Sequence, residues 1–126
     1  MEHTGGSVVN IGRIHSKLTK PGFLSYATSK SALTGLTQSL AVDLGARIRV
    51  NEIQPAATDT EMLRKGFKND PAAYDRLKGY HPLQCIASPD NIASAVIFLL
   101  SDKSSFISGS ILSVDGAIGC RLHDPS

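Results

Sequence analysis

Short β-rich runs alternate with longer helical patterns along the chain, and this alternation limits the folds that the sequence can adopt. Apolar, β-branched runs bounded by turn residues predict strands at about 7–12, 47–54 and 109–114. Between them, apolar positions at three- and four-residue spacing predict helices over 25–44 and 89–101. Strands separated by helices favour parallel pairing with right-handed crossovers. We therefore expect an α/β fold of three parallel strands with helices on both faces.

The two main helices carry different signals. The first has one apolar stripe, expected to be buried, and Gly45 as its stop; the stripe is Leu33, Leu36, Leu40 and Leu44. The second has Ser88 as N-cap, Pro89 in the first turn and Asp90 near the positive helix end. The polar stretch 61–78 contains Gly66 and Pro71, so we expect one or two short helices there, forming a flap.

The expected sheet is small for residues 1–126, which we take as a single domain. Outer strands present unpaired backbone groups and apolar faces that normally need another strand or chain against them. Glu52 is anomalous inside a buried strand, because an unpaired buried carboxylate is costly. We expect it to face solvent or a partner, or to be reached by a basic neighbour such as Arg47 or Arg49. Something beyond these three strands is needed to complete the fold.

Charge and composition exclude several classes of function. The net charge is +2 and the basic residues are scattered, so nucleic acid is not an expected partner. No run of about 20 apolar residues and no secretory signal is present, which favours a soluble, cytoplasmic protein without a membrane partner. Cys85 and Cys120 lie far apart without Cys/His ligand spacing, so we expect ordinary thiols and no metal site.

Tyr26 and Lys30 stand four residues apart near the start of the first helix, so they share one helix face. An ammonium beside a phenol favours its ionised form and fits it for acid/base work. The segment Tyr26-Ala27-Thr28-Ser29-Lys30 resembles the catalytic segment of short-chain dehydrogenases/reductases. Further landmarks follow in the family's order over nearly the whole chain: Arg49-Val50-Asn51 leading to Pro55, His81-Pro82-Leu83, Ser88-Pro89, Phe98-Leu99-Leu100-Ser101-Asp102, and Ser108-Gly109 leading to Val114-Asp115-Gly116.

The resemblance implies the C-terminal portion of a Rossmann-like, doubly wound, NAD(P)-binding fold, with NAD or NADP as cofactor. In it Tyr26 exchanges the substrate proton, and Lys30 also binds the nicotinamide ribose. Pro55, Thr58 and Thr60 match the loop that packs on the nicotinamide; an N-cap for the next short helix is the other reading of Thr60. Ala56 replaces the family's Gly, which costs about 1 kcal/mol if that position needs a positive φ.

Two departures from the family pattern bear on activity. Arg13 occupies the position of the family's catalytic serine, and a guanidinium there is larger, charged and a donor only. Ser16, three residues on, is a substitute only if the loop is rewound. No Gly-rich phosphate loop follows any expected strand, and in this fold the pyrophosphate rests at the first helix N-terminus.

The sequence therefore leaves three hypotheses open. In the first, the chain is an NAD(P)-dependent oxidoreductase for an alcohol or ketone that needs a further half and is inactive as an isolated chain. In the second, it is a non-catalytic remnant that forms a homo-oligomer or pairs with full-length relatives through helix 25–44, whose small residues Ala32, Gly35 and Ser39 permit close helix contact. In the third, it is a marginally folded translation product with no role.

Overall fold

The computed structural model describes residues 5–14 and 21–122 of the 126-residue chain. Strands and helices alternate as the sequence predicts, with boundaries that differ by one or two residues. The elements are β1 (Gly6–Ile11), α1 (Leu24–Leu44), β2 (Ile48–Pro55), α2 (Glu61–Gly66), α3 (Pro71–Gly79), α4 (Pro89–Leu100), the 3₁₀ turn η2 (Asp102–Ser104), β3 (Ile111–Val114) and the 3₁₀ turn η3 (Ile118–Cys120).

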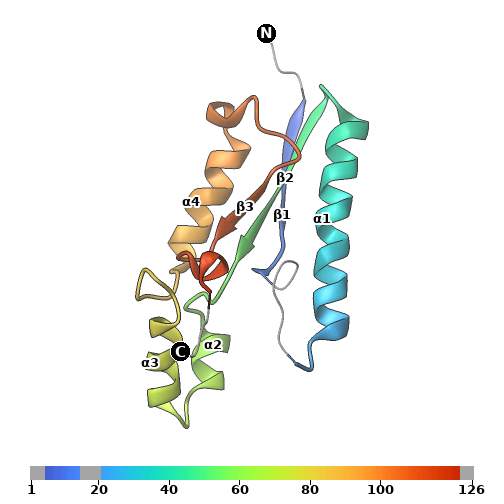
Figure 1. The fold of residues 1–126 in the computed structure, drawn as a ribbon. Helices are drawn as coiled ribbons and strands as arrows, with labels where there is room; N and C mark the ends of the chain where they lie inside the picture. The colour runs from blue at the N-terminus through green and yellow to red at the C-terminus, as the bar shows by residue number, and fades with distance from the viewer. Residues whose placement is uncertain (1–4, 15–20, 123–126) are drawn as a thin grey trace.

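The three strands form one parallel sheet in the order β1-β2-β3. Val8 of β1 lies opposite Val50, and Glu52 lies opposite Ile111 of β3. α1 packs on one face of the sheet and α4 on the other, while α2 and α3 extend beyond the end at which the strands finish (Figure 1). The predicted α/β fold, with helices on both faces, is confirmed.

Polar side chains are buried on both faces of the central strand. The buried apolar residues of the described chain are few: Val50, Ile53, Ala56 and Leu99. On the α4 side, the Arg49 guanidinium donates to three carbonyl oxygens, those of Ser101 (3.1 Å), Ser104 (2.9 Å) and Ile107 (3.1 Å). Next to it, the Asn51 amide donates to the Ile107 carbonyl and accepts from the backbone N–H of Ser110. β2 thus fixes the segment that leads from α4 into β3 by hydrogen bonds rather than by apolar contact.

Glu52 and its neighbours correct two sequence-based expectations. Glu52 is fully buried against α1, where its carboxylate accepts from Gln54 (2.9 Å) and from the hydroxyls of Thr34 (3.2 Å) and Thr37 (3.4 Å). It therefore faces neither solvent nor an arginine, since Arg49 points to the opposite face. The expected stripe of buried leucines on α1 is wrong for Leu36, which is 51% exposed, and the buried residue of α1 is Thr37. α1 contacts the sheet through hydroxyls because β2 offers it a carboxylate and an amide.

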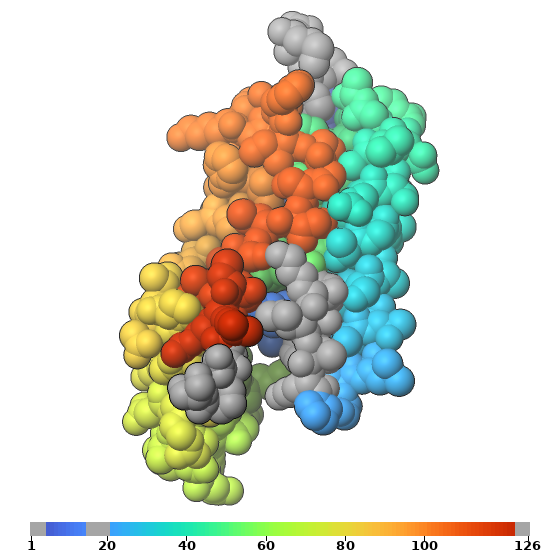
Figure 2. All heavy atoms as spheres, in the orientation of Figure 1, coloured from blue at the N-terminus to red at the C-terminus, as the bar shows by residue number. Residues whose placement is uncertain are grey.

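Apolar side chains remain exposed along three parts of the surface. On the outer strand β1, Val8 and Ile11 are exposed; on α1, so are Leu24, Leu36 and Val42. The region of α4 and β3 exposes a third group: Ile97, Phe98, Leu100, Phe106 and Leu112. α1 and α4 run along the two sides of the space-filling view, so both helices present side chains outward (Figure 2). Apolar side chains that lie together on a surface are typical of regions that bind another protein segment.

α4 begins as predicted, with Ser88 as its N-cap. The Ser88 hydroxyl accepts from the Asn91 backbone N–H, and the Asn91 side chain accepts in return from the Ser88 N–H, which completes a capping box. Leu99, near the other end of α4, is buried against the sheet. The capping box therefore fixes the residue at which α4 begins, and Leu99 identifies the face that packs on the sheet.

Replacement of Arg49 tests how much its hydrogen bonds to the segment between α4 and β3 stabilise the fold. Arg49→Lys keeps the charge but loses the planar fork that reaches several carbonyls at once, so we expect the free energy of unfolding to fall by about 2 kcal/mol. Arg47→Lys is the matched control, because Arg47 is exposed, and it should change stability by less than about 0.5 kcal/mol. Chemical denaturation of the two variants measures the difference, and equal losses would contradict the role given to Arg49.

Among the described residues, two other than glycine adopt a left-handed backbone, Gln84 (φ 59°) and Ala117 (φ 72°). A side chain costs about 1 kcal/mol or more in this conformation. Ala117→Gly should therefore raise the free energy of unfolding by about 0.5 kcal/mol, after the larger chain entropy of glycine in the unfolded state is subtracted. Ala93→Gly, at an exposed position inside α4, should instead lower it by about 1 kcal/mol. Thermal unfolding of both variants tests the opposite signs.

Candidate active site

Tyr26 and Lys30 lie together on the first two turns of α1. The Lys30 Nζ stands 5.5 Å from the centroid of the Tyr26 ring, within the range of a cation–π contact. On its other side Tyr26 meets Phe23 edge-on, with ring centroids 6.0 Å apart. Tyr26 is 39% exposed, so its ring is supported by two neighbours and still open to solvent. The four-residue spacing has produced the proximity that the sequence predicts.

The position of the family's serine lies just beyond β1. Arg13 is half-buried there and follows Gly12, whose backbone N–H donates to the Ile53 carbonyl at 2.8 Å. A Cβ on Gly12 would collide with Oε2 of Glu52. A side chain at position 12 would therefore displace the Glu52 carboxylate from its hydrogen bonds to Thr34 and Gln54. Ser16 lies outside the described residues.

The segment after β2 runs along the same edge of the sheet. Pro55 is the last residue of β2 and lies opposite Val114, while Thr58 forms an isolated parallel bridge with Ala87. Thr60 is the N-cap of α2, with its hydroxyl accepting from the backbone N–H of Leu63 at 3.2 Å. Ala56 is absent from the residues with positive φ, so its methyl group carries no backbone strain.

Asp59, in the middle of this segment, is a site feature that the sequence analysis missed. Its carboxylate accepts two hydrogen bonds from Arg64 of α2, each 2.7 Å long, and one from the Tyr74 hydroxyl of α3 at 2.8 Å. The Tyr74 ring also meets Phe67 edge-on and lies beneath the Lys78 ammonium. We name the three residues Asp59, Arg64 and Tyr74 the flap clasp, because together they tie both short helices to the end of β2.

The flap clasp shifts the ionisation of its own members. The hydrogen bonds from Arg64, followed by that from Tyr74, hold the pKa of Asp59 well below its usual range. The pKa of Tyr74 is raised above 10.0, first by its hydrogen bond to Asp59 and then by desolvation. Asp59 is therefore a carboxylate at any physiological pH, and Tyr74 stays protonated as its donor.

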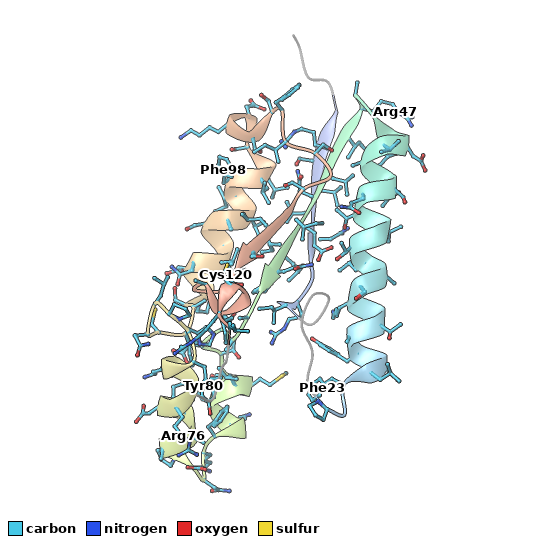
Figure 3. The ribbon with its side chains drawn as sticks, in the orientation of Figure 1. Phe23, Arg47, Arg76, Tyr80, Phe98 and Cys120 are labelled. Atoms are coloured by element: carbon cyan, nitrogen blue, oxygen red, sulfur yellow. The ribbon has the colours of Figure 1, made fainter. Side chains whose placement is uncertain are left out.

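Figure 1 shows how these parts share one edge of the molecule. α1 begins at the end of the sheet where the strands finish, and α2 follows β2 at that same end. In Figure 3, Phe23 is labelled at the start of α1, three residues before Tyr26. Tyr80 and Arg76 are labelled at the flap, on the other side of the view. The structure thus brings Tyr26 and Lys30 together on α1 and places Pro55, Thr58 and Thr60 on a separate segment. In open α/β sheets this edge is the one that binds ligands.

The comparisons with known proteins fit this arrangement. A family model described as enoyl-(acyl carrier protein) reductase matches residues 1–118. The chain is 40% identical to pig carbonyl reductase [NADPH] 2 over 111 residues, which is 87% of this chain and 45% of the relative. The chain belongs to the short-chain dehydrogenase/reductase family.

Two solved structures of the family extend the comparison. The ligand-free aldohexose dehydrogenase of Thermoplasma acidophilum superposes with a TM-score of 0.88 at 34% identity and covers 97% of this chain and 52% of its own. A gluconate 5-dehydrogenase of Burkholderia cenocepacia, solved with NADP and tartrate, gives a TM-score of 0.85 at 31% identity and covers 94% and 47%. This family member therefore spans about half the length of the relatives it matches. None of its described helices is long and apolar enough to cross a membrane.

Removal of the Asp59 charge tests the flap clasp. In Asp59→Asn, the pKa of Tyr74 should fall back toward 10.0, and amide hydrogen exchange should become faster in 61–79. Asp75→Asn is the matched control, because it removes a neighbouring carboxylate whose ion pair with Lys78 is long, 3.9 Å, and largely exposed. Ultraviolet titration of the tyrosines measures the change in the pKa of Tyr74. An unaltered exchange pattern in Asp59→Asn would show that other contacts hold the flap.

The raised pKa of Tyr74 also predicts the pH dependence of stability. The folded chain holds this proton more tightly than the unfolded chain, so the contribution is complete below pH 10 and is lost as the pH rises through the folded-state value. Tyr74→Phe should therefore lose stability relative to wild type at neutral pH, and the difference should shrink at alkaline pH. Denaturation of both proteins across this range provides the measurement.

Proposed function

We propose that the chain contributes the catalytic pair of an NAD(P)-dependent oxidoreductase that interconverts an alcohol and a ketone. The observation that carries this proposal is the Lys30 ammonium 5.5 Å from the Tyr26 ring, at the ligand-binding edge of the sheet. Tyr26 would give a proton to the substrate oxygen in reduction and take it back in oxidation. Lys30 would hydrogen-bond the ribose of the cofactor.

The residues after β2 suit the nicotinamide end of such a cofactor. Thr60 already accepts from Leu63 through its oxygen, so its hydroxyl hydrogen remains available as a donor. Pro55 is held in β2, and Thr58 is held beside Ala87, so the segment is ordered without a ligand. The bound cofactor would supply or accept the hydride, while the residues of this chain would orient it and move the proton.

The described residues offer much less to the rest of a dinucleotide. The residue before α1 is Phe23, which provides no side-chain cap, and no Gly-rich loop connects β1 to α1 in the sequence. Arg13, at the family's serine position, places a guanidinium where a small hydroxyl orients the substrate oxygen. We therefore propose that these 126 residues alone do not turn over substrate and that the activity needs the remaining half of the fold.

Calorimetric titration with NAD(H) and NADP(H) tests the cofactor part of this proposal. The folded chain should give no heat at millimolar cofactor, both as wild type and as Arg13→Ser. Micromolar binding by either form would contradict the proposed need for another half. With a family-type N-terminal half supplied, Tyr26→Phe should abolish turnover, whereas Tyr80→Phe, at the C-cap of α3, should retain it.

Exposed residues on α1 favour a second candidate function, self-association without catalysis. Leu36 is 51% exposed beside Gly35, which has open space where a Cβ would stand, so a second helix can approach closely there. Val42, 81% exposed, comes seven residues after Gly35 and so lies on the same face of α1 as this glycine. Leu36→Asp should convert an oligomer to monomer in sedimentation experiments. A compact wild-type monomer would exclude this function.

A further inference from the structure

The backbone of Tyr26 is fixed more firmly than its ring. Ala27 donates its backbone N–H to the Phe23 carbonyl at 2.8 Å, and the Ser29 hydroxyl donates to the Tyr26 carbonyl at 2.9 Å. Tyr26 therefore stands in a hydrogen-bonded first turn of α1. The residue is 39% exposed, and a helix allows an aromatic side chain two χ1 rotamers, near 180° and −60°. The contacts of the ring decide which of the two is occupied.

Two neighbours of different kinds contact the Tyr26 ring. The Phe23 ring meets it with the centroids 6.0 Å apart and the planes at 89°. Edge-to-face pairs favour this geometry, because the edge of an aromatic ring is positive and its face negative. The Lys30 ammonium, 5.5 Å from the centroid, sits on a flexible four-carbon side chain that can follow the ring. Phe23 is therefore the contact that discriminates between orientations of the ring.

The turn before α1 determines where the Phe23 ring lies. Phe23 is half-buried and is the N-cap of α1, where it provides no side-chain hydrogen bond. Figure 3 shows it at the start of this helix. Gly22 before it adopts φ 87°, in the left-handed region that favours glycine, although a Cβ there would meet no other atom within 4 Å. The backbone conformation of Gly22, rather than crowding, thus sets the direction from which Phe23 enters α1.

We propose that Phe23 is a positioning residue for Tyr26, whose ring it holds in the rotamer that lies beside Lys30. The inference rests on the proposed function, because the orientation of the phenol matters to a reaction only if its hydroxyl exchanges a proton with the substrate. Proton transfer needs this hydroxyl within hydrogen-bond distance of the reacting oxygen, and a misplacement of about 1 Å can cost on the order of 100-fold in rate. Phe23 prepares the ring before substrate and cofactor arrive.

NMR of the full chain with isotope-labelled tyrosines tests the ring packing without catalysis. Three-bond couplings to Cγ of Tyr26 measure its rotamer populations, and Tyr26→Phe assigns the signals. Phe23→Leu keeps an apolar side chain but removes the ring, so we expect the ratio of the second rotamer to the first to rise about two- to tenfold. Phe23→Tyr retains an aromatic edge and should keep the wild-type populations.

The flap offers the matched control, because Phe67 meets Tyr74 edge-on with centroids 5.7 Å apart. Phe67→Leu should leave the couplings of Tyr26 unchanged. Gly22→Ala is a second variant of the positioning itself. It keeps the Phe23 ring but strains the turn before α1, so it should also populate the second rotamer. Wild-type amide shifts in β2 and α4 establish that each variant is folded.

Assembly with a family-type N-terminal half tests the catalytic consequence. Phe23→Leu should lower kcat about two- to tenfold and leave KM unchanged, because the ring packing affects the reacting geometry rather than substrate binding. Phe23→Tyr should restore kcat.

Three results would overturn the proposal. They are unchanged Tyr26 couplings in both Phe23→Leu and Gly22→Ala, an equal change in Phe67→Leu, and altered rotamer populations in Phe23→Leu with unchanged kcat. Absence of turnover in the assembled wild type is distinguishable from these. It would contradict the proposed function, whereas the couplings report the ring packing independently of turnover.

Discussion

The guanidinium of Arg49 fixes the geometry of one whole side of the molecule. A buried charged group is costly unless it is hydrogen-bonded, and the carbonyls of Ser101, Ser104 and Ile107 accept from the two terminal nitrogens of this guanidinium, while its Nε has no partner among the described residues. These carbonyls belong to the chain between α4 and β3, so β3 can enter the sheet only along the path that they set. Asn51, two residues further along β2, also bonds to this part of the chain, since its amide donates to the Ile107 carbonyl and accepts from the Ser110 N–H. Because such bonds are directional, they specify a single arrangement where a small apolar core alone would not.

On the opposite face of β2, a buried polar side chain again positions a neighbouring element. Here that element is α1, which carries the candidate active site. Glu52 is satisfied by hydroxyls of α1 and by Gln54, and its closeness to Gly12 leaves no room for a side chain there. α1 is thus placed against β2 by polar contacts, and its first turns carry Tyr26 and Lys30 to the end of the sheet. The outer strand β1 has no neighbour on its other side among the described residues, and Val8 and Ile11 remain exposed along it. This agrees with a chain that spans about half the length of its relatives.

The edge at which the strands finish contains two regions built in different ways. On the α1 side, a helix presents two side chains whose relation depends only on the helical repeat. On the α4 side, the flap clasp depends on contacts between separate segments of the chain, and the bridge between Thr58 and Ala87 connects the segment after β2 to the start of α4. The backbone N–H of Asp59 also donates to the Ala87 carbonyl, so the flap clasp is joined to the residue that precedes the N-cap of α4.

The sequence by itself determined the order of elements, the parallel sheet, the capped start of α4 and the Tyr26–Lys30 proximity, because each depends on local periodicity or on a spacing within one helix. It did not determine the exposure of Leu36, the surroundings of Glu52 or the flap clasp. Those depend on which face of β2 meets which helix, and on pairs such as Asp59 with Tyr74 that no local pattern connects. Only the tertiary structure decided them, because a buried polar group takes whatever partner the packed chain brings within hydrogen-bond distance.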